Sequence, residues 1–166
     1  MGLRPTGNRI RETLFNWLAP YIEGATCLDL FAGSGALSFE ALSRGAKSCT
    51  ALDNNPAVIA QLKANQSQLK ASNLQILGAD SRNYLQHTEA REQFDIVFMD
   101  PPFATTLHQE ISLLLTNNLW LSPGALIYSE LPVSEPSLAM PNWQLLKEKT
   151  AGEVKYCLHQ YVELSA

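Results

Sequence analysis

The sequence predicts an α/β fold in which a mostly parallel sheet of seven strands has helices on both faces. Three observations support this prediction. Short apolar runs typical of buried strands alternate along the chain with segments of helical periodicity. Glycine or proline marks several of the boundaries between them. Near the C-terminus, two strand-like runs flank Gly152, which predicts an antiparallel hairpin at one edge of the sheet.

The first half of the chain contains three helix–strand pairs. Helices are indicated by apolar residues three or four positions apart, by the Asn55-Pro56 start and by the closing Gly45, and strands by short apolar runs. In order, these signals predict a helix over 8–22, a strand over 26–31, a helix over 36–44, a strand over 48–52, a helix over 55–69 and a strand over 73–77.

The second half continues the alternation. Phe94–Met99 is a nearly continuous apolar run, as expected of a central strand that is covered on both faces. Three prolines make 131–142 mostly loop, with room for one short helix. The remaining signals predict a helix over 84–92, a helix over 107–115, a turn over 121–124, a strand over 125–129 and closing strands over 143–149 and 154–164.

Composition limits the class of protein. The 166 residues, 46% hydrophobic and 17% charged, predict one folded domain over 1–166. We expect no membrane span and no secretory signal. Three scattered cysteines and three isolated histidines favour a reducing, cytoplasmic location and no metal site. The formal net charge of −4 does not favour binding naked nucleic acid over the whole surface.

The first candidate site is the segment Asp29–Gly35, which follows the first predicted strand. Its glycines permit a tight turn and a close approach of the backbone to a ligand beside a helix N-terminus. Ser38 stands where a dinucleotide fingerprint has its third glycine, which counts against a dehydrogenase. A carboxylate at Asp29 favours a cationic ligand, such as an ammonium or a sulfonium, although it could also cap the turn.

Two further acids follow the second and third strands. Asp53 is placed to accept hydrogen bonds from ribose hydroxyls, or to cap the turn before Asn55. Asp80, next to Ser81, could accept from an adenine amino group or cap the following helix. Ligands of such sheets bind at the carboxyl ends of the strands, so acids after three successive strands favour a common site.

The most specific motif is Asp100-Pro101-Pro102-Phe103, directly after the fourth predicted strand. The prolines stiffen the chain and remove two backbone donors, which leaves the Asp100 carboxylate and the Pro101 carbonyl as fixed acceptors. Two acceptors and a stacking ring suit a planar base with an exocyclic NH2. A proline-rich turn with a packed phenylalanine is the structural alternative.

These motifs resemble the S-adenosylmethionine-dependent methyltransferases that modify exocyclic amines, whose fold is the Rossmann-like class I arrangement. More narrowly, the chain is similar to the bacterial small-subunit ribosomal RNA guanine-N2 methyltransferase family. The similarity covers most of the chain and is strongest over 4–46 and 94–103. It is based on the segments Arg4–Asn16, Leu28–Leu37, Glu40–Ala46 and Asp100–Phe103.

The resemblance implies a role for each motif. Asp100, Pro101 and Phe103 would hold the target guanine, and Asp100 could also take the released proton. S-adenosylmethionine would be the cofactor and S-adenosylhomocysteine the product, with no metal. The implied cofactor contacts are Asp29, Phe31, Gly33, Gly35, Asp53, Asn54, Asp80 and Ser81, and the implied RNA contacts are Arg4, Arg9, Arg11 and Asn16.

The implied partner is small-subunit ribosomal RNA, and the protein is expected to act as a monomer. The family usually has a basic stretch before the Arg-Pro-Thr segment, whereas this sequence starts almost at that segment. An assembled or assembling ribosomal particle is therefore a substrate candidate beside naked RNA. Two rivals remain open: the same chemistry on adenine N6 or a glutamine amide, and a non-catalytic nucleotide-binding assembly factor.

Overall fold

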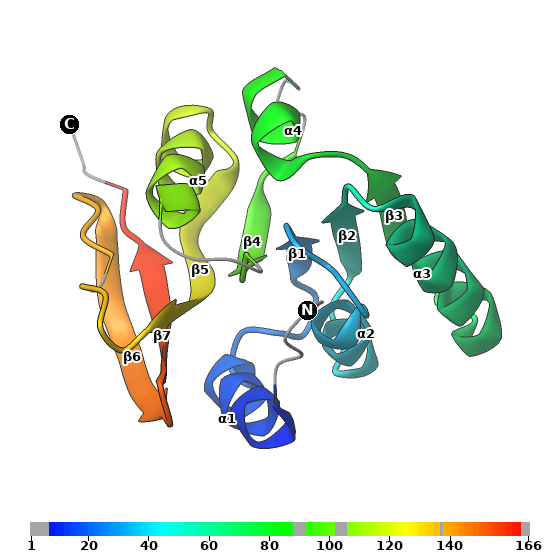
Figure 1. Ribbon diagram of the computed structural model, residues 1–166, viewed down its shortest axis with the longest axis horizontal. Coiled ribbons are helices and arrows are strands. Elements are labelled where there is room, and N and C mark those ends of the chain that lie inside the picture. Colours follow the sequence, from blue (N-terminus) through cyan, green and yellow to red (C-terminus); the bar gives the residue numbers. More distant parts are fainter. Residues whose placement is uncertain (1–6, 88–91, 102–105, 137, 164–166) are drawn as a thin grey trace.

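A computed structural model of the chain describes residues 7–87, 92–101, 106–136 and 138–163. Its seven-stranded sheet has the order β3-β2-β1-β4-β5-β7-β6 (Figure 1). The strands are β1 (Thr26–Asp29), β2 (Ser48–Asp53), β3 (Leu74–Gly78), β4 (Phe94–Met99), β5 (Leu121–Pro132), β6 (Trp143–Ala151) and β7 (Val154–Tyr161). The helices are α1 (Asn8–Leu18), α2 (Ala36–Ser43), α3 (Pro56–Leu69), α4 (Ser81–His87) and α5 (Thr106–Asn117).

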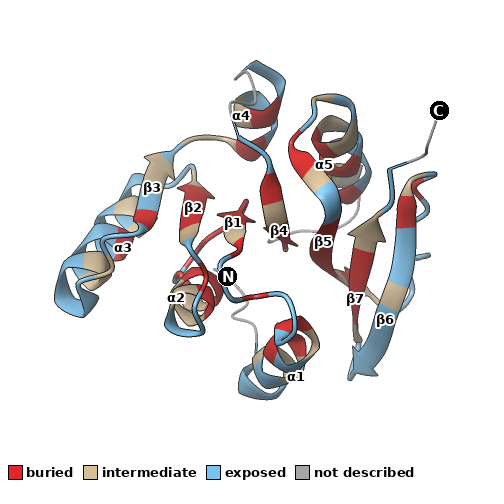
Figure 2. Cartoon of the chain, turned by 180° about the vertical axis from the view of Figure 1, so that it is seen from behind, coloured by how far each residue is buried: buried red, intermediate tan, exposed pale blue. Residues whose placement is uncertain are grey.

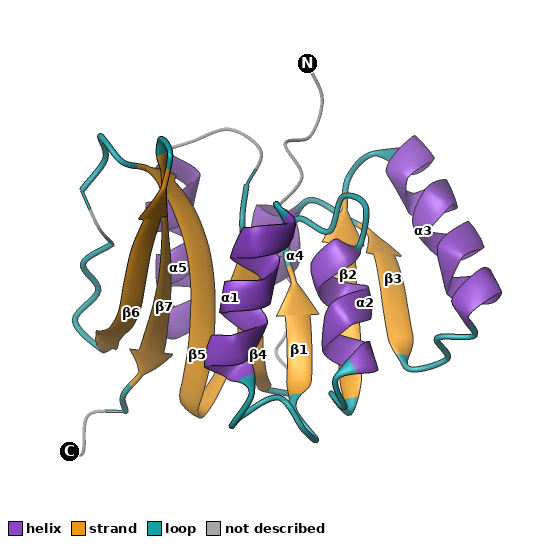
Figure 3. Cartoon of the chain, turned by 90° about the horizontal axis from the view of Figure 1, so that it is seen from below, coloured by secondary structure: helices purple, strands orange, loops and turns teal. Residues whose placement is uncertain are grey.

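The predicted fold class is confirmed. Strands β1 to β5 pair in parallel, and β7 pairs antiparallel with both β5 and β6. Helices α1, α2 and α3 cover one face of the sheet, and α4 and α5 cover the other (Figure 3). Each face therefore has its own hydrophobic core. Leu14 and Leu18 of α1 belong to the first, and Ile111 and Leu115 of α5 to the second.

The strands in the middle of the sheet are more buried than the edge strand β6 (Figure 2). The central strand β4 is buried along almost its whole length, which explains its continuous apolar run. The edge strand β6 is mostly exposed, and the sign of the charge alternates along Lys147, Glu148 and Lys149. Charged side chains on an exposed edge oppose pairing with another chain. None of the helices in the described part of the chain is long and apolar enough to span a membrane.

Several predicted boundaries were wrong. Helix α1 ends at Leu18 rather than at 22, because Pro20 has no N–H to continue the helical hydrogen bonds, and Tyr21 is exposed. Helix α4 begins at Ser81, three residues earlier than predicted, because Asp80 caps it. The end of that predicted helix, 88–91, lies outside the described residues.

The segment 121–124 was predicted as a turn but belongs to β5. Leu121 pairs with Phe94, and the register then shifts so that Leu126 pairs with Ile96. The extra residues of β5 are accommodated as an irregularity at Gly124, whose φ of 80° lies in the left-handed region. The described part of 131–142 contains no helix; it holds the end of β5 followed by a loop.

Candidate active site

The acids predicted to form the site lie along one edge of the sheet. Strands β1, β2, β3 and β4 run parallel, so their carboxyl ends meet at the same edge (Figure 3). Asp29 and Asp53 are the last residues of β1 and β2. Asp80 follows β3, and Asp100 follows β4. The structure therefore brings the four predicted acids to a common edge.

The glycine loop connects β1 to α2 at this edge. Gly33 and Gly35 both have positive φ, of 54° and 81°. Gly35 is the N-cap of α2, and a Cβ built on it would lie 2.6 Å from Cδ2 of the fully buried Leu62. A side chain at this position is therefore excluded both by the backbone conformation and by the packing of α2 against Leu62 of α3.

Asp53 fixes the glycine loop from the neighbouring strand. Its Oδ2 accepts a hydrogen bond from the Gly33 N–H at 3.1 Å, and its Oδ1 accepts from the Asn55 N–H at 3.0 Å. One carboxylate thus joins the loops that follow β1 and β2. Asn54, the next residue along the chain, is exposed at the same turn.

Asp29 is buried at the end of β1, with 3% of its surface exposed. Its Oδ2 accepts a hydrogen bond of 2.6 Å from the hydroxyl of Ser38 in α2. Burial raises the pKa of Asp29 from 3.8 to about 6, and the hydrogen bonds from Ser38 and from the Phe31 backbone act against this rise. A buried carboxylate of this kind gains most from a cationic neighbour.

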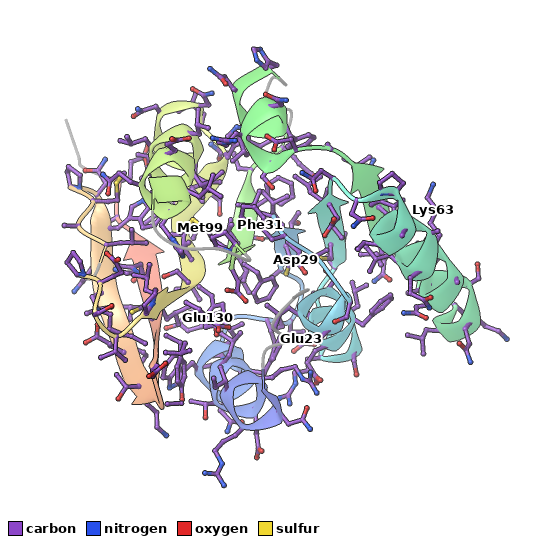
Figure 4. The ribbon with its side chains drawn as sticks, in the orientation of Figure 1. Glu23, Asp29, Phe31, Lys63, Met99 and Glu130 are labelled. Carbon is purple, nitrogen blue, oxygen red and sulfur yellow. The ribbon has the colours of Figure 1, made fainter. Side chains whose placement is uncertain are left out.

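The predicted cofactor contacts Phe31, Asp80 and Ser81, which follow β1 and β3, also make contacts within the protein itself. Phe31 is partly buried beside the α4–α5 core, close to Asp29 (Figure 4). The Ser81 hydroxyl donates to the Leu30 carbonyl, which ties the start of α4 to the end of β1. Oδ1 of Asp80 accepts from the Asn83 N–H at 3.1 Å, so the capping role that the sequence left open is present.

Asp100 and Pro101 occupy the position predicted for them, immediately past β4. The Asp100 side chain is partly exposed, and Pro101 is buried. Strand β4 lies beside β1, with Phe98 opposite Asp29 and the Leu30 N–H donating to the Phe98 carbonyl at 3.1 Å. The two candidate ligand positions are therefore neighbours. Phe103 and Arg4 lie outside the described residues.

The predicted RNA contacts on α1 lie on the same face as α2. Arg9 and Asn16 are exposed. Arg11 donates to Oδ1 of Asn8 at 2.8 Å and lies 3.9 Å from Glu40 of α2. Both helices begin at the edge where β1 ends (Figure 3). Arg11 is therefore part of a surface network between the two helices.

Sequence reasoning missed Tyr128 and Glu130 of β5. The Tyr128 side chain is fully buried, and its hydroxyl donates to Oε2 of Glu130 at 2.6 Å. Burial, and then the charge of Glu130, raise the pKa of Tyr128, so the hydroxyl stays protonated. The sequence signal for Glu130 is the same as for the first four strands, an acid near the end of an apolar run.

With this geometry established, the comparisons with known proteins identify the family. The family model described as Conserved hypothetical protein 95 matches residues 1–160. The chain belongs to this family. A curated relative, the ribosomal RNA small subunit methyltransferase D of Haemophilus influenzae, is 50% identical over 161 residues, which is 96% of this chain and 83% of the relative.

Solved structures share the fold of this chain. The Escherichia coli protein yhhF matches with a TM-score of 0.90 and 47% identity, over 98% of this chain and 90% of that one. An RNA methyltransferase from Salinibacter ruber in complex with S-adenosyl-L-homocysteine matches with a TM-score of 0.75 over 98% of this chain and 97% of that one. At 14% identity the second likeness shows the fold alone.

Proposed function

We propose that this chain transfers a methyl group from S-adenosylmethionine to the exocyclic N2 amine of a guanine in small-subunit ribosomal RNA. The observation on which this proposal rests most is the placement of Asp100-Pro101 beside the Asp29–Gly35 loop, on adjacent parallel strands. The methyltransferase fold and a 50% identical relative named as a small-subunit ribosomal RNA methyltransferase support the coarser activity.

The residues at this edge fit the cofactor. Gly33 and Gly35 form a tight turn at the N-terminus of α2, and Asp29 is a buried carboxylate that a cation would stabilise. The Asp53 carboxylate is positioned at the end of β2, where a ribose would be held. When bound, S-adenosylmethionine supplies an electrophilic methyl group on a sulfonium. We expect Asp29 and the glycine loop to hold its methionine part, and Asp80 and Ser81 to lie by its adenine.

Asp100 and the Pro101 carbonyl are proposed to prepare the amine for attack. The lone pair of a guanine N2 is conjugated with the ring, which makes it a poor nucleophile. Hydrogen bonds from both N–H groups to fixed acceptors favour a pyramidal nitrogen, and binding both reactants side by side supplies proximity. Asp100 can then accept the proton that the amine releases. The base must leave its stack to reach this edge.

Methyl transfer to ribosomal particles tests the proposal. Small subunits that lack guanine-N2 methylation are incubated with the protein and labelled S-adenosylmethionine, with naked ribosomal RNA in parallel, and the nucleosides are analysed. N2-methylguanosine is the expected product. Because the net charge is −4, we expect the particle to be the better substrate, since its own proteins can supply contacts. Label on N6-methyladenosine instead would overturn the guanine assignment.

Cofactor affinity is expected to fall as the pH drops through about 6. Burial raises the pKa of Asp29 to about 6, so the carboxylate is ionised at pH 8 and mostly protonated at pH 5. Titration calorimetry should show S-adenosylmethionine binding about tenfold more weakly at pH 5 than at pH 8, because the attraction for the cation is lost. Asp29→Asn should bind more weakly at pH 8 and show little change with pH.

The stability of the protein without cofactor should change with pH in the opposite direction to cofactor affinity, and should rise as the pH falls through about 6. The folded pKa lies above the unfolded value of 3.8, so the ionised, buried carboxylate lowers the free energy of unfolding above pH 6. This loss is relieved as the pH falls from 6 towards 4. Identical pH profiles of cofactor binding in the wild type and Asp29→Asn would contradict the role given to this residue.

A further inference from the structure

Glu130 lies beside Asp100 at the candidate active site. The parallel register pairs Phe98 with Tyr128 and Met99 with Ser129, so the next position places Asp100 level with Glu130. Phe98 and Tyr128 belong to the core on the α1 side of the sheet, and Glu130, two residues further along β5, is on the same side (Figure 4). Strand β5 continues past the end of β4, so Glu130 borders the segment that Asp100 begins.

Both the side chain and the backbone of Glu130 are fixed by hydrogen bonds. Its Oε2 accepts the hydroxyl of the fully buried Tyr128 at 2.6 Å. Its carbonyl lies 2.8 Å from Nε2 of the buried His108 in α5, and its backbone pairs with Tyr156 of β7. A carboxylate has two oxygens and about four acceptor positions, and the hydrogen bond from Tyr128 occupies one of them and fixes the orientation of the group. It is therefore a preorganised acceptor group rather than a freely rotating surface acid.

The carboxylates of Asp100 and Glu130 both influence the hydroxyl of Tyr128. Both carboxylates raise the pKa of the Tyr128 hydroxyl, after the larger effect of burial. Two acids, Asp100 after β4 and Glu130 on β5, therefore lie near Tyr128, and the Pro101 carbonyl would be a third acceptor beside them. Such a set of acceptors suits a ligand edge with more than the two donor hydrogens of a single NH2 group.

The exocyclic amines considered as substrates differ in the atom beside the amine. In guanine the N2 amine adjoins N1–H, which is a third donor. In adenine the N6 amine adjoins the unprotonated N1, and in a glutamine amide the NH2 adjoins a carbonyl oxygen; both neighbours are acceptors. A carboxylate next to the amine site would accept from guanine N1–H but would repel a lone pair at the same place.

We propose that Glu130 is a specificity-determining residue that accepts the N1–H of the target guanine, while Asp100 and Pro101 hold its N2 amine. This inference rests on the proposed function, because it concerns the base that the same site takes. A site built to accept from a substrate N–H rejects the analogue without it far more strongly than an apolar pocket rejects a missing methylene. The pair of carboxylates would therefore exclude adenine and glutamine as well as position guanine.

The test replaces the target guanine of the RNA by 2-aminopurine. This base keeps the amine at C2 but has an unprotonated N1 and no oxygen at C6. With wild-type protein, kcat/KM for guanine should exceed that for 2-aminopurine by at least about thirtyfold, because a hydrogen bond to a charged acceptor is lost. Inosine, which keeps N1–H and the oxygen but lacks the amine, should act as a competitive inhibitor and should not be methylated.

The protein side of the test is Glu130→Gln. The glutamine amide can rotate to donate to the unprotonated N1, so the preference for guanine over 2-aminopurine should fall by at least about tenfold. The matched control, Glu153→Gln, changes an exposed glutamate in the β6–β7 turn and should keep the wild-type preference. Tyr128→Phe removes the hydroxyl that orients Glu130 and should shift the preference in the same direction by a smaller factor.

The outcomes separate this inference from the proposed function. If the wild type does not methylate guanine in any RNA or particle, the proposed function fails and this inference fails with it. If the wild type methylates guanine but accepts 2-aminopurine within about threefold, the role of Glu130 alone is overturned, whether or not the variants fold. An unchanged preference in a folded Glu130→Gln protein would overturn it as well.

Discussion

Replacing Asp100 by alanine is expected to lower kcat for methyl transfer at least about hundredfold while the dissociation constant of S-adenosylmethionine changes less than about threefold. Asp100 lies past the end of β4, one strand away from the glycine loop. Its carboxylate is assigned to the reacting amine, so its loss removes an interaction that strengthens as the nitrogen becomes pyramidal. Single-turnover rates at saturating cofactor, together with calorimetric cofactor titrations, measure the two quantities separately.

Asp95→Ala is the matched control for Asp100→Ala. Asp95 lies near the start of β4, at the end of the strand opposite to Asp100, where its carboxylate accepts from the Thr26 N–H at 2.9 Å and the Ser122 hydroxyl at 2.8 Å. Its replacement should lower the free energy of unfolding by about 1–3 kcal/mol, because the Thr26 N–H loses its partner and the Ser122 hydroxyl keeps only the Phe94 carbonyl, and should leave kcat near the wild-type value. Near-normal turnover by Asp100→Ala would remove Asp100 from the mechanism.

Replacing Asp53 by alanine is expected to weaken S-adenosylmethionine binding about ten- to hundredfold. The Asp53 carboxylate holds the Gly33 and Asn55 N–H groups, at 3.1 and 3.0 Å, and is the proposed acceptor for the ribose. The substitution therefore loosens the glycine loop and removes a hydrogen bond to a charged group, worth about 1.5–3 kcal/mol. Calorimetry gives the affinity, and kcat at saturating cofactor should stay within about threefold of wild type.

The Asp95→Ala protein also serves as the control here. It loses the same number of hydrogen bonds donated to a carboxylate, but at the edge remote from the glycine loop, so its cofactor affinity should be unchanged. A thermal-shift series with S-adenosylmethionine offers a second readout, since a ligand at 100 times its dissociation constant adds about 2.7 kcal/mol of stability. An Asp53→Ala protein with wild-type affinity would assign the carboxylate to loop structure alone.

The local signals in the sequence were sufficient for most elements. Strand β4 was predicted with its observed bounds, because a strand buried on both faces has a continuous apolar pattern that local reading detects. Helix α3 was found from its Asn55 cap and first-turn proline, and the cap accepts from the Ala57 N–H at 2.9 Å. The predicted elements were wrong where pairing with a distant segment outweighed the local sequence signal. The proline and glycine of 121–124 indicate a turn, yet pairing with β4 keeps the segment in β5.

By itself the sequence determined the alternation of strands and helices, the glycine loop and the acids at or just after the ends of four strands, since each depends on neighbours within a few positions. Only the tertiary structure decided which of these residues meet. The bond from Gly33 to Asp53 spans 20 residues, and the approach of Glu130 to Asp100 depends on the register between β4 and β5. Strand order and register are set by packing between segments distant in the chain, and no local pattern contains that information.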